Sequence, residues 1–545
     1  SQPCELHRRP HYVALSSNLP WRAPVASRTI CLSNSLNKCL ARPSDDTIAQ
    51  EFSPIRPHDS SAFVPTPSEL VRVKETLGPC VFGYQDKNLG ACTIECPVIH
   101  WLREKRMYYD DTEHYSHTDH TAESLYSHFQ AIHAEHGWTR VVKFPPFDKF
   151  EPPYAYCCQK AKDPMKDRPI VSYFHHPLKL VYHVGARALA MMLQAAAMLT
   201  FTLWKVQDLS PMLRAWFADL RNTFGSFTRF LRWCADVKEM YTGVPHAEAI
   251  RAIEFVIDRM ATATRASRRF VRVEKRLHGL IEFGHANHLL PGHTTLSFAD
   301  VRAICCVDVR QCFFKSLGVI LHQDLGVPMG SPGAPNLAIC LCSYFEHQFR
   351  SSVTDFIRHL RPEFQAMRAE FCRYVDDLFG LITWDARFPF SRDIAQALVD
   401  HLRTHAYMYH PNMTIKDEPS DGWFPYLDAL VRCPDAGPLE VRFNVKNYAP
   451  LRDTGALKLL TIQHRSSFMS DRTAMSRILG TLHRLRACVD TPAHRLRGAY
   501  ELLVVYEAQG YPQHLFCDAL RALGNKFRET SWFAVSRLIR LARTL

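Results

Sequence analysis

Two adjacent carboxylates, Asp376 and Asp377, lie inside the otherwise apolar run FCRYVDDLFGLI, residues 371–382. The flanking residues predict a buried β-hairpin, and aspartate is common in the tight turn that joins two strands. An ionised carboxylate is costly to bury unless a cation or hydrogen-bond donors compensate its charge. Taken alone, the pair therefore indicates turn chemistry and a cation site about equally well.

A third acid, Asp236, lies far upstream in LRWCADVKEMYTGVPHAEAI, residues 231–250. A short apolar strand delivers this aspartate, Tyr241 follows it, and an amphipathic helix is predicted next. Aspartates from two strands that lie side by side form a hard-oxygen site suited to Mg²⁺ rather than zinc. Two such ions, about 4 Å apart, can activate a hydroxyl nucleophile and stabilise a leaving phosphate oxygen. The two motifs together predict that metal compensates the buried acids.

The segment between these acids, HQDLGVPMGSPGAPNLAICLCSYFEHQF at residues 322–349, is rich in glycine and proline at its start. These residues oppose an early helix, and we predict that a helix begins near Asn336. Glycine lets a backbone approach a ligand closely, which suits contact with a nucleotide or a template base. A plain loop before a helix is the alternative interpretation.

Together, these stretches resemble the palm motifs of reverse transcriptases, most closely those of Penelope-like elements, which are related to telomerase. Asp236 matches the first palm acid, GVPMGSPGAP the glycine-serine-proline motif, and YVDD the paired-acid motif. Further stretches resemble that family in the same order: DKNLG (86–90), KAKDPMKDRPIVS (160–172), GWFPYLDALV (422–431), QHRSSF (463–468) and GYP (510–512). A telomerase is less favoured, because no RNA-binding domain of the telomerase type is identifiable.

The resemblance implies an α+β fold of the right-hand polymerase type, with fingers, a palm built on an antiparallel sheet plus helices, and a helical thumb. The expected divisions are an irregular N-terminal extension at 1–65, an N-terminal region with fingers at 66–235, the palm with inserted fingers elements at 236–431, and the palm–thumb connection with a basic helical thumb at 432–545.

The resemblance also implies roles for individual residues. Asp236, Asp376 and Asp377 are the expected catalytic acids, and Asp236, Asp376 and the carbonyl of Val237 are the expected ligands of two Mg²⁺ ions, with Mn²⁺ as an alternative. The expected nucleotide-binding residues are Arg168, Lys160, Tyr241, Gly330, Ser331, Pro332 and Lys416. Lys166 is an alternative to Lys160, and Lys87 is a weaker basic candidate.

Three of these residues have distinct expected roles. The Tyr241 ring is expected to crowd the sugar 2′ carbon and favour deoxynucleotides, with a core tyrosine as the alternative. Lys416 is expected to give a proton to pyrophosphate, although a surface lysine explains it equally well. Arg168 is expected to contact the triphosphate, because a guanidinium binds phosphate in a bidentate manner.

The implied function is RNA-directed DNA synthesis by a retroelement enzyme, in which two metal ions assist nucleotide transfer from a dNTP to a primer 3′-OH. The expected partners are an RNA template, a DNA primer and dNTPs, with no membrane, and protein partners stay open. The alternative is a catalytically retired nucleic-acid-binding protein derived from a reverse transcriptase. RNA-directed RNA synthesis is disfavoured by Tyr241.

The distribution of charge supports a polyanionic partner. The formal charge is +12, and residues 451–545 alone hold 15 Lys and Arg against seven Asp and Glu. A basic region of this kind favours nucleic acid, with a solvated arginine-rich helical surface as the alternative. The 18 cysteines are scattered without a repeated framework, which predicts reduced thiols and an intracellular protein, in the nucleus or the cytoplasm.

Two further patterns have structural interpretations. The apolar run ALAMMLQAAAMLTFTLW, residues 188–204, has 17 residues and contains Gln194, so a buried helix is favoured over a membrane span. His114, His117 and His120 have the spacing of one helical face, which zinc would need. A polar helix face is the default interpretation of the histidines.

Overall fold

The computed structural model describes residues 80–541, apart from several gaps. It also describes residues 13–16 and the single positions 68, 72, 75 and 78. The gaps within it are 87, 161–162, 197, 199, 277–278, 287–290, 360–366, 389–390, 405–408, 414, 418–421, 435–437, 458–461, 463, 466–469 and 490. The predicted N-terminal extension, 1–65, therefore lies outside the described residues except for one strand, and Lys87 lies outside them too.

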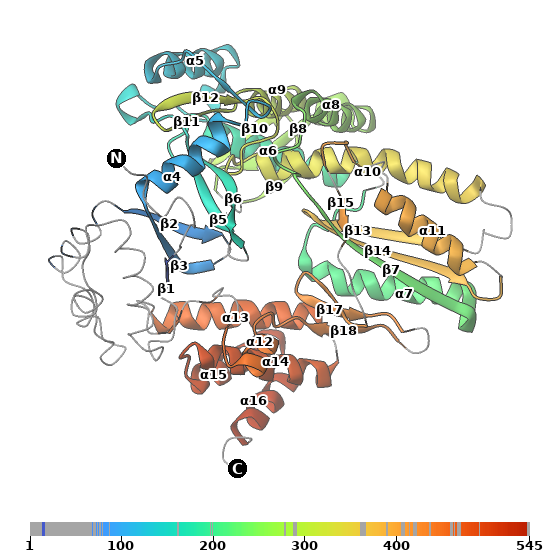
Figure 1. The fold of residues 1–545 in the computed structure, drawn as a ribbon. Helices are drawn as coiled ribbons and strands as arrows, with labels where there is room; N and C mark the ends of the chain where they lie inside the picture. The colour runs from blue at the N-terminus through green and yellow to red at the C-terminus, as the bar shows by residue number, and fades with distance from the viewer. Residues whose placement is uncertain are drawn as a thin grey trace.

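The described part of the chain contains four sheets, so the expected mixture of helices and sheets is confirmed (Figure 1). The largest has the order β1-β3-β2-β5-β11-β12-β4, with β6 paired to β5. Its strands are β1 (Val13–Ser16), β2 (Val81–Asp86), β3 (Asn88–Glu95), β4 (Tyr115–His117), β5 (Tyr154–Lys160), β6 (Asp163–Ser172), β11 (Phe313–Ser316) and β12 (Val319–Gln323). We call it the N-terminal sheet.

The three other sheets are smaller. We call the four-stranded sheet β13-β14-β7-β15 the central sheet; its strands are β7 (Thr228–Val237), β13 (Met367–Tyr374), β14 (Asp377–Asp385) and β15 (Ile415–Asp417). The sheet β10-β8-β9 consists of β8 (Phe270–Glu274), β9 (Ile281–Gly284) and β10 (His293–Ser297). The last sheet consists of β16 (Phe424–Tyr426), β17 (Ala429–Arg432) and β18 (Glu440–Phe443).

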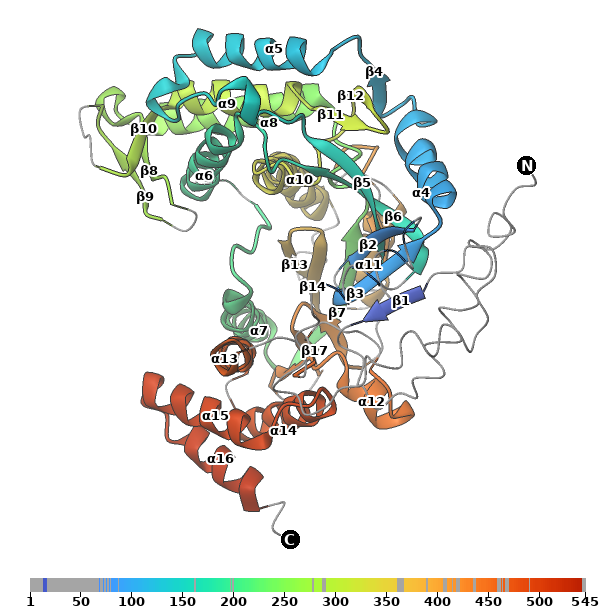
Figure 2. The ribbon, with the colours of Figure 1, turned by 90° about the vertical axis from the view of Figure 1, so that its left-hand side faces the viewer.

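Helices cover these sheets and form the C-terminal part. They are α4 (Pro97–Glu104), α5 (Ala122–Glu135), α6 (Lys179–Ala195), α7 (Leu209–Phe224), α8 (His246–Ala263), α9 (Phe298–Arg310), α10 (Ala334–His359), α11 (Ser391–Thr404), α12 (Tyr448–Thr454), α13 (Asp471–Cys488), α14 (Pro492–Ala508), α15 (Gln513–Phe527) and α16 (Ser531–Leu541). Figure 2 shows α13–α16 at the end of the molecule opposite to α5, α8 and α9. No helix in the described ranges is long and apolar enough to cross a membrane.

Alternating side chains bury both faces of the central sheet. Trp233 and Ala235 of β7 belong to the large core formed with α6, α8, α9 and α10, whereas Cys234 faces a second core with α7 and β16–β18. Leu378 and Phe379 of β14 divide in the same way. This period of two is the strand signature that the FCRYVDDLFGLI run predicted, so the buried hairpin is confirmed.

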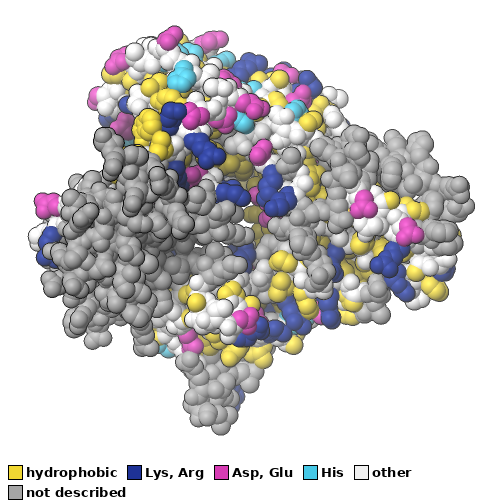
Figure 3. All heavy atoms as spheres, in the orientation of Figure 1, with side chains coloured by type: hydrophobic (Ala, Val, Ile, Leu, Met, Phe, Trp, Pro, Cys, Tyr) yellow, Lys and Arg dark blue, Asp and Glu magenta, His cyan; other side chains and the backbone are white. Residues whose placement is uncertain are grey.

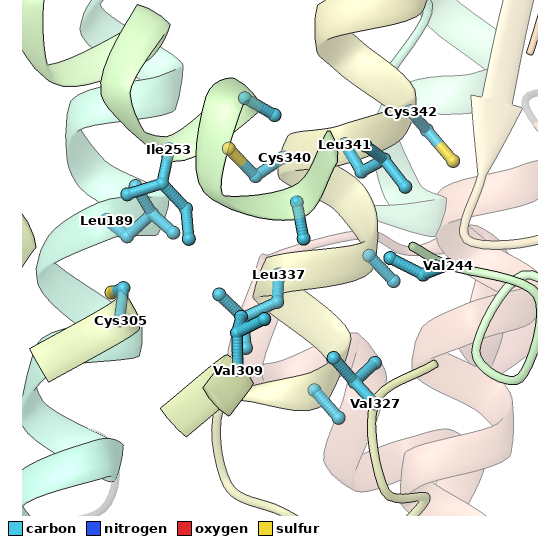
Figure 4. Packing of buried hydrophobic residues seen from close by; sticks show 14 of the residues in the cluster. Leu189, Val244, Ile253, Cys305, Val309, Val327, Leu337, Cys340, Leu341 and Cys342 are labelled. Carbon is cyan, nitrogen blue, oxygen red and sulfur yellow. The ribbon is translucent and has the colours of Figure 1, made fainter. Parts of the chain in front are cut away.

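The large core joins segments that are far apart in the sequence. Figure 4 shows Leu189 of α6, Ile253 of α8, Cys305 of α9 and Leu337 of α10 packed together. All four side chains are almost fully buried. Close packing of this kind fixes the helices relative to one another. The helix that follows the glycine-serine-proline segment is therefore held by the same core as the central sheet.

The C-terminal helices have a separate core, which includes Ile478, Leu482, Leu502 and Phe516. Ser470 is the N-cap of α13, and its hydroxyl accepts a hydrogen bond from the Thr473 amide. A serine side chain is favoured at an N-cap because its oxygen satisfies an otherwise free backbone amide.

Two sequence-based interpretations need correction. Only the first part of the apolar run 188–204 is the predicted buried helix: α6 ends at Ala195, and Thr202 forms a bridge with Arg373. The histidines lie on and around the short strand β4 rather than on a helix. Only His117 belongs to β4, with His114 before the strand and His120 after it, so the helical spacing on which a shared zinc site would depend is absent.

Candidate active site

The central sheet brings two of the predicted acids together. Asp377 of β14 pairs in register with Asp236 of β7, and Lys416 of β15 pairs with Asp236 from the other side. Register partners in an antiparallel pair point to the same face, with Cβ atoms about 4.5–5.5 Å apart. Asp377, Asp236 and Lys416 therefore form one row across three strands at the end of the sheet. The exposed Lys416 is thus in line with the predicted acids.

Asp376 lies in the two-residue turn between β13 and β14, since Tyr374 and Asp377 are the last pair of that hairpin. The other turn residue, Val375, has a φ of 56°. A β-branched side chain is strained in this left-handed region, and such strain persists only where surrounding contacts hold it. The aspartate therefore occupies a tight turn, as one interpretation of the acid pair predicted. That turn also lies beside a second acid, Asp236.

Three successive carbonyls of this hairpin end are each bound by a different group. Val375 O accepts a hydrogen bond from Arg373 Nη1 at 2.8 Å, and Asp376 O accepts one from the Val237 amide, also at 2.8 Å. Asp377 O accepts one from the hydroxyl of Tyr426 on β16, at 3.0 Å. The backbone that carries Asp376 and Asp377 is therefore fixed from β13, β7 and β16.

The acids provide the hard oxygens that a divalent cation prefers. In this structure the ammonium of Lys238, which is 43% exposed, forms an ion pair with the Asp236 carboxylate. Within the described ranges, no group of three or more His, Cys, Asp and Glu side chains is arranged to hold a metal ion. The donor chemistry therefore fits Mg²⁺, but the three acids share one end of the sheet without forming a three-ligand cluster.

Tyr241 lies in the loop between β7 and α8, and its ring is half-buried. Burial, followed by the charge of Asp376, raises the pKa of the Tyr241 hydroxyl to about 12, while Arg168 opposes that rise. Charges act in this way only at short range, so Tyr241 lies near both the acid of the turn and the arginine of β6. The predicted sugar-contacting residue is thus close to two of the other predicted residues.

A group of positive charges lies next to the acids. Burial lowers the pKa of Lys160, and the neighbouring charges of Arg168, Lys238 and Lys166 lower it further. Arg168 Nε itself is 3.0 Å from a carboxylate oxygen of Asp86. Repulsion among cations of this kind is relieved when an anion binds between them. Figure 3 shows Lys and Arg side chains gathered around the hollow between the N-terminal sheet and the C-terminal helices.

The glycine-serine-proline segment packs directly against β6. The Val171 amide donates to Met329 O at 2.9 Å, and a Cβ added to Gly330 would lie 2.0 Å from Val171 O. Gly330 has a φ of 136°, so both its conformation and this close approach require glycine. The segment is therefore held beside the strand that carries Arg168.

Ser331 faces inward. Its side chain is buried, and its hydroxyl donates a hydrogen bond to Asp308 Oδ1 of α9 at 2.8 Å. The sequence predicted that Ser331 would contact the template or nucleotide, but in this structure its hydroxyl supports the loop instead. Pro332, the third predicted residue of the segment, is half-buried.

Asp308 gives a prediction on pH. Burial raises its pKa from 3.8 to about 7, although the Ser331 hydrogen bond opposes the shift. Because the folded state binds this proton more tightly than the unfolded state, the stabilisation is complete below pH 4 and is lost as the pH rises through about 7. We expect Asp308→Asn to become more stable relative to wild type as the pH rises from 5 to 8, by at most about 3 kcal/mol.

Unfolding midpoints of both proteins at pH 5 and pH 8 test this prediction. Tyr173 and Tyr182, whose pKa values the Asp308 charge helps to raise, remain neutral throughout the range. A stability difference that does not change with pH would show that Asp308 keeps the same charge in both folded and unfolded protein.

Several residues of this site were not predicted from the sequence. Arg373 and Glu346 are fully buried, and Lys238 and Tyr426 contact predicted acids directly. Arg373 had a detectable signal, because an arginine in an apolar strand needs a buried partner. The partner itself could not be identified from the sequence.

Comparisons with known proteins bear on the fold. No family model matches the chain, and no curated protein matches it. The chain does match the structure of telomerase from Candida albicans in complex with the TWJ fragment of telomeric RNA, with a TM-score of 0.52 at 12% identity, over 94% of this chain and 83% of that one. The fold of this chain is therefore similar to that of this telomerase structure.

Telomerase from Candida tropicalis is less similar. The apo structure gives a TM-score of 0.44 at 11% identity over 95% of this chain and 79% of that chain, and its complex with the TWJ fragment gives 0.47 at 10% identity over 95% and 77%. The conclusion on the fold depends on the Candida albicans structure. Membership of the Penelope-like group stays a prediction.

Proposed function

We propose that this protein is an RNA-directed DNA polymerase of a retroelement, related to the Penelope-like enzymes. The observation that carries the proposal is the in-register pairing of Asp377 with Asp236, with Asp376 in the adjoining turn. Three acids at one end of a sheet, beside a group of cations, suit the transfer of a nucleotide from a triphosphate. The telomerase-like fold supports the proposal, and the RNA in the Candida albicans structure supports an RNA partner.

The proposed reaction forms a bond between the primer 3′ oxygen and the α-phosphorus of a dNTP, and pyrophosphate leaves. Asp236 and Asp376, with the Val237 carbonyl, are the proposed ligands of two Mg²⁺ ions, and Asp377 supports them. When bound, such ions act as Lewis acids on the attacking hydroxyl and on the leaving oxygen. Mn²⁺ has a similar preference for oxygen ligands.

The other residues bind and orient the substrates in this proposal. Arg168 and Lys160 bind the triphosphate, because a bound anion relieves the repulsion between cations that are held close together. Lys238 releases Asp236 when metal binds. The backbone at Gly330 and Pro332 lies beside β6 and faces the template and nucleotide, and Lys416, in the row of Asp236, protonates pyrophosphate. In the hand description, β7 and β13–β15 belong to the palm, and α13–α16 form the thumb, where arginines bind duplex phosphates.

Primer extension by the purified full-length chain tests the proposal. A DNA primer on an RNA template, with dNTPs and Mg²⁺, should be extended, and chelation of the metal should stop the reaction. Salt-sensitive binding of the primer–template without any extension would overturn the proposal, and would identify a retired polymerase that only binds nucleic acid.

Tyr241 provides a test of the proposed substrate class. We expect Tyr241→Ala to reduce the preference for dNTPs over NTPs by about tenfold or more, because the ring no longer crowds the 2′ position. Tyr241→Phe keeps the ring and should keep the preference. Single-nucleotide incorporation with each substrate measures the ratio, and an unchanged ratio in the alanine variant would show that the ring does not select the sugar.

A further inference from the structure

Arg373 is a charged residue with no exposed surface. It lies on β13, and both its guanidinium and the carboxylate of Glu346 on α10 are 0% exposed. The two groups form an ion pair in which Arg373 Nε donates to Glu346 Oε1. A buried pair of this kind often adds little net stability, so a fold retains it more readily where it also fixes a geometry.

The other two nitrogens of the Arg373 guanidinium show which parts of the chain the ion pair holds in place. Nη2 donates to Thr202 Oγ1 at 2.9 Å, and Nη1 donates to Val375 O at 2.8 Å. The backbone of Arg373 is fixed as well, since its amide donates to Phe201 O at 2.6 Å and its carbonyl accepts from the Leu203 amide at 2.8 Å. The planar guanidinium is thus held on all sides, and one of its bonds reaches the turn.

Glu346 is fixed by further partners. Its Oε1 accepts a hydrogen bond from the hydroxyl of Tyr409 at 2.7 Å, and its Oε2 accepts one from the Phe201 amide at 2.9 Å. Glu346 belongs to the helix that directly follows the glycine-serine-proline segment. The network therefore joins that helix, the extended segment around Thr202 and the turn of the acids.

The hydrogen bond from Arg373 Nη1 to Val375 O is the one that reaches the candidate active site. Val375 holds the strained φ of 56°, and Asp376 is the next residue. We infer that Arg373, held by Glu346, is a positioning residue that keeps the Val375–Asp376 turn in the conformation that presents Asp376 beside Asp236. This inference rests on the proposed function for its catalytic consequence, but the contact itself can be tested without activity.

Arg373→Lys is the decisive variant. Lysine keeps the positive charge for Glu346, but its single nitrogen cannot reproduce the fork that also reaches Val375 O. Tyr409→Phe is the matched control, because it removes a hydrogen bond to the same Glu346 oxygen and leaves the Arg373–Val375 bond in place. Both variants are made in the full-length chain.

Hydrogen exchange tests the positioning directly. The Val237 amide, which donates to Asp376 O, and the amides of 374–377 report on the turn. We expect exchange at these amides to be about tenfold faster or more in Arg373→Lys, and within about twofold of wild type in Tyr409→Phe. Equal exchange in the two variants would overturn the inference. If Arg373→Lys does not fold, Thr202→Val replaces it, with about threefold faster exchange expected, and no change there overturns the inference.

Primer extension tests the catalytic consequence. Arg373→Lys should lower kcat by about 10- to 100-fold while the KM for dNTP and the affinity for primer–template stay within about twofold, because only the acid is misplaced. Val375→Gly added to Arg373→Lys should restore kcat by about threefold or more, since glycine adopts this φ without strain. A normal kcat in Arg373→Lys would overturn this inference but would leave the proposed function standing. An inactive wild type would instead overturn the proposed function, while hydrogen exchange still decides whether Arg373 holds the turn.

Discussion

Asp376→Ala is expected to lower the rate of primer extension by about 10³-fold or more, the range found when a group that stabilises charge in the transition state is removed. Asp376 lies in the turn whose carbonyl is bonded to the Val237 amide, next to the pair of Asp236 and Asp377. Its removal leaves the site without one of the two aspartates that are proposed to bind both metal ions. The measurement is single-turnover extension on an RNA template with Mg²⁺.

Binding and a matched variant separate this effect from misfolding. The alanine variant should bind primer–template as tightly as wild type, because the acid repels phosphate rather than attracting it. Asp110→Ala is the control: Asp110 is 51% exposed and pairs only with Lys105 among the ion pairs described, so extension should be unchanged. Undiminished extension by Asp376→Ala would refute the proposed polymerase mechanism.

Glu346→Ala is expected to destabilise the protein by about 3–5 kcal/mol, the usual result when one partner of a buried ion pair is removed. Arg373 would keep its charge, because a guanidinium does not lose its proton under these conditions, and it would have no exposed surface through which water could solvate it. The hydroxyl of Tyr409 and the Phe201 amide would also lose their acceptor. The change is measured as a lower midpoint of thermal or denaturant unfolding.

An exposed ion pair provides the comparison. Asp518 and Arg521 on α15 are 43% and 46% exposed, and surface pairs of this kind contribute about 0–1 kcal/mol. Asp518→Ala should therefore leave the unfolding midpoint close to that of wild type. A Glu346→Ala variant as stable as Asp518→Ala would mean that Arg373 finds another partner or reaches solvent.

Local sequence patterns predicted the parts of the fold that neighbouring residues determine. The alternation around Asp376 and Asp377 predicted the buried hairpin, and Ser470 is of a residue type that favours the start of a helix such as α13. The glycines and prolines at the start of residues 322–349 predicted that a helix begins only near Asn336, and α10 begins at Ala334. These features depend on side-chain periodicity, caps and backbone sterics, so they can be recognised within a few residues.

Local patterns failed where a distant partner changes the outcome. The run 188–204 has the composition of a buried helix, but its later part is drawn into an extended bridge with Arg373. The hydroxyl of Ser331 likewise donates a hydrogen bond to a buried carboxylate on α9, a partner that the loop sequence does not indicate. Neither partner is near in the sequence, so neither could be inferred from it.

The sequence by itself determined which acids this protein has, in which short segments they lie and what kind of ion their oxygens suit. Only the tertiary structure decided that Asp377 stands opposite Asp236, that Val375 is strained, and that Arg373 and Glu346 lie beneath the turn. The physical reason is that strand register and the burial of charge are set by contacts between segments far apart in the chain, whose free energies depend on the whole core.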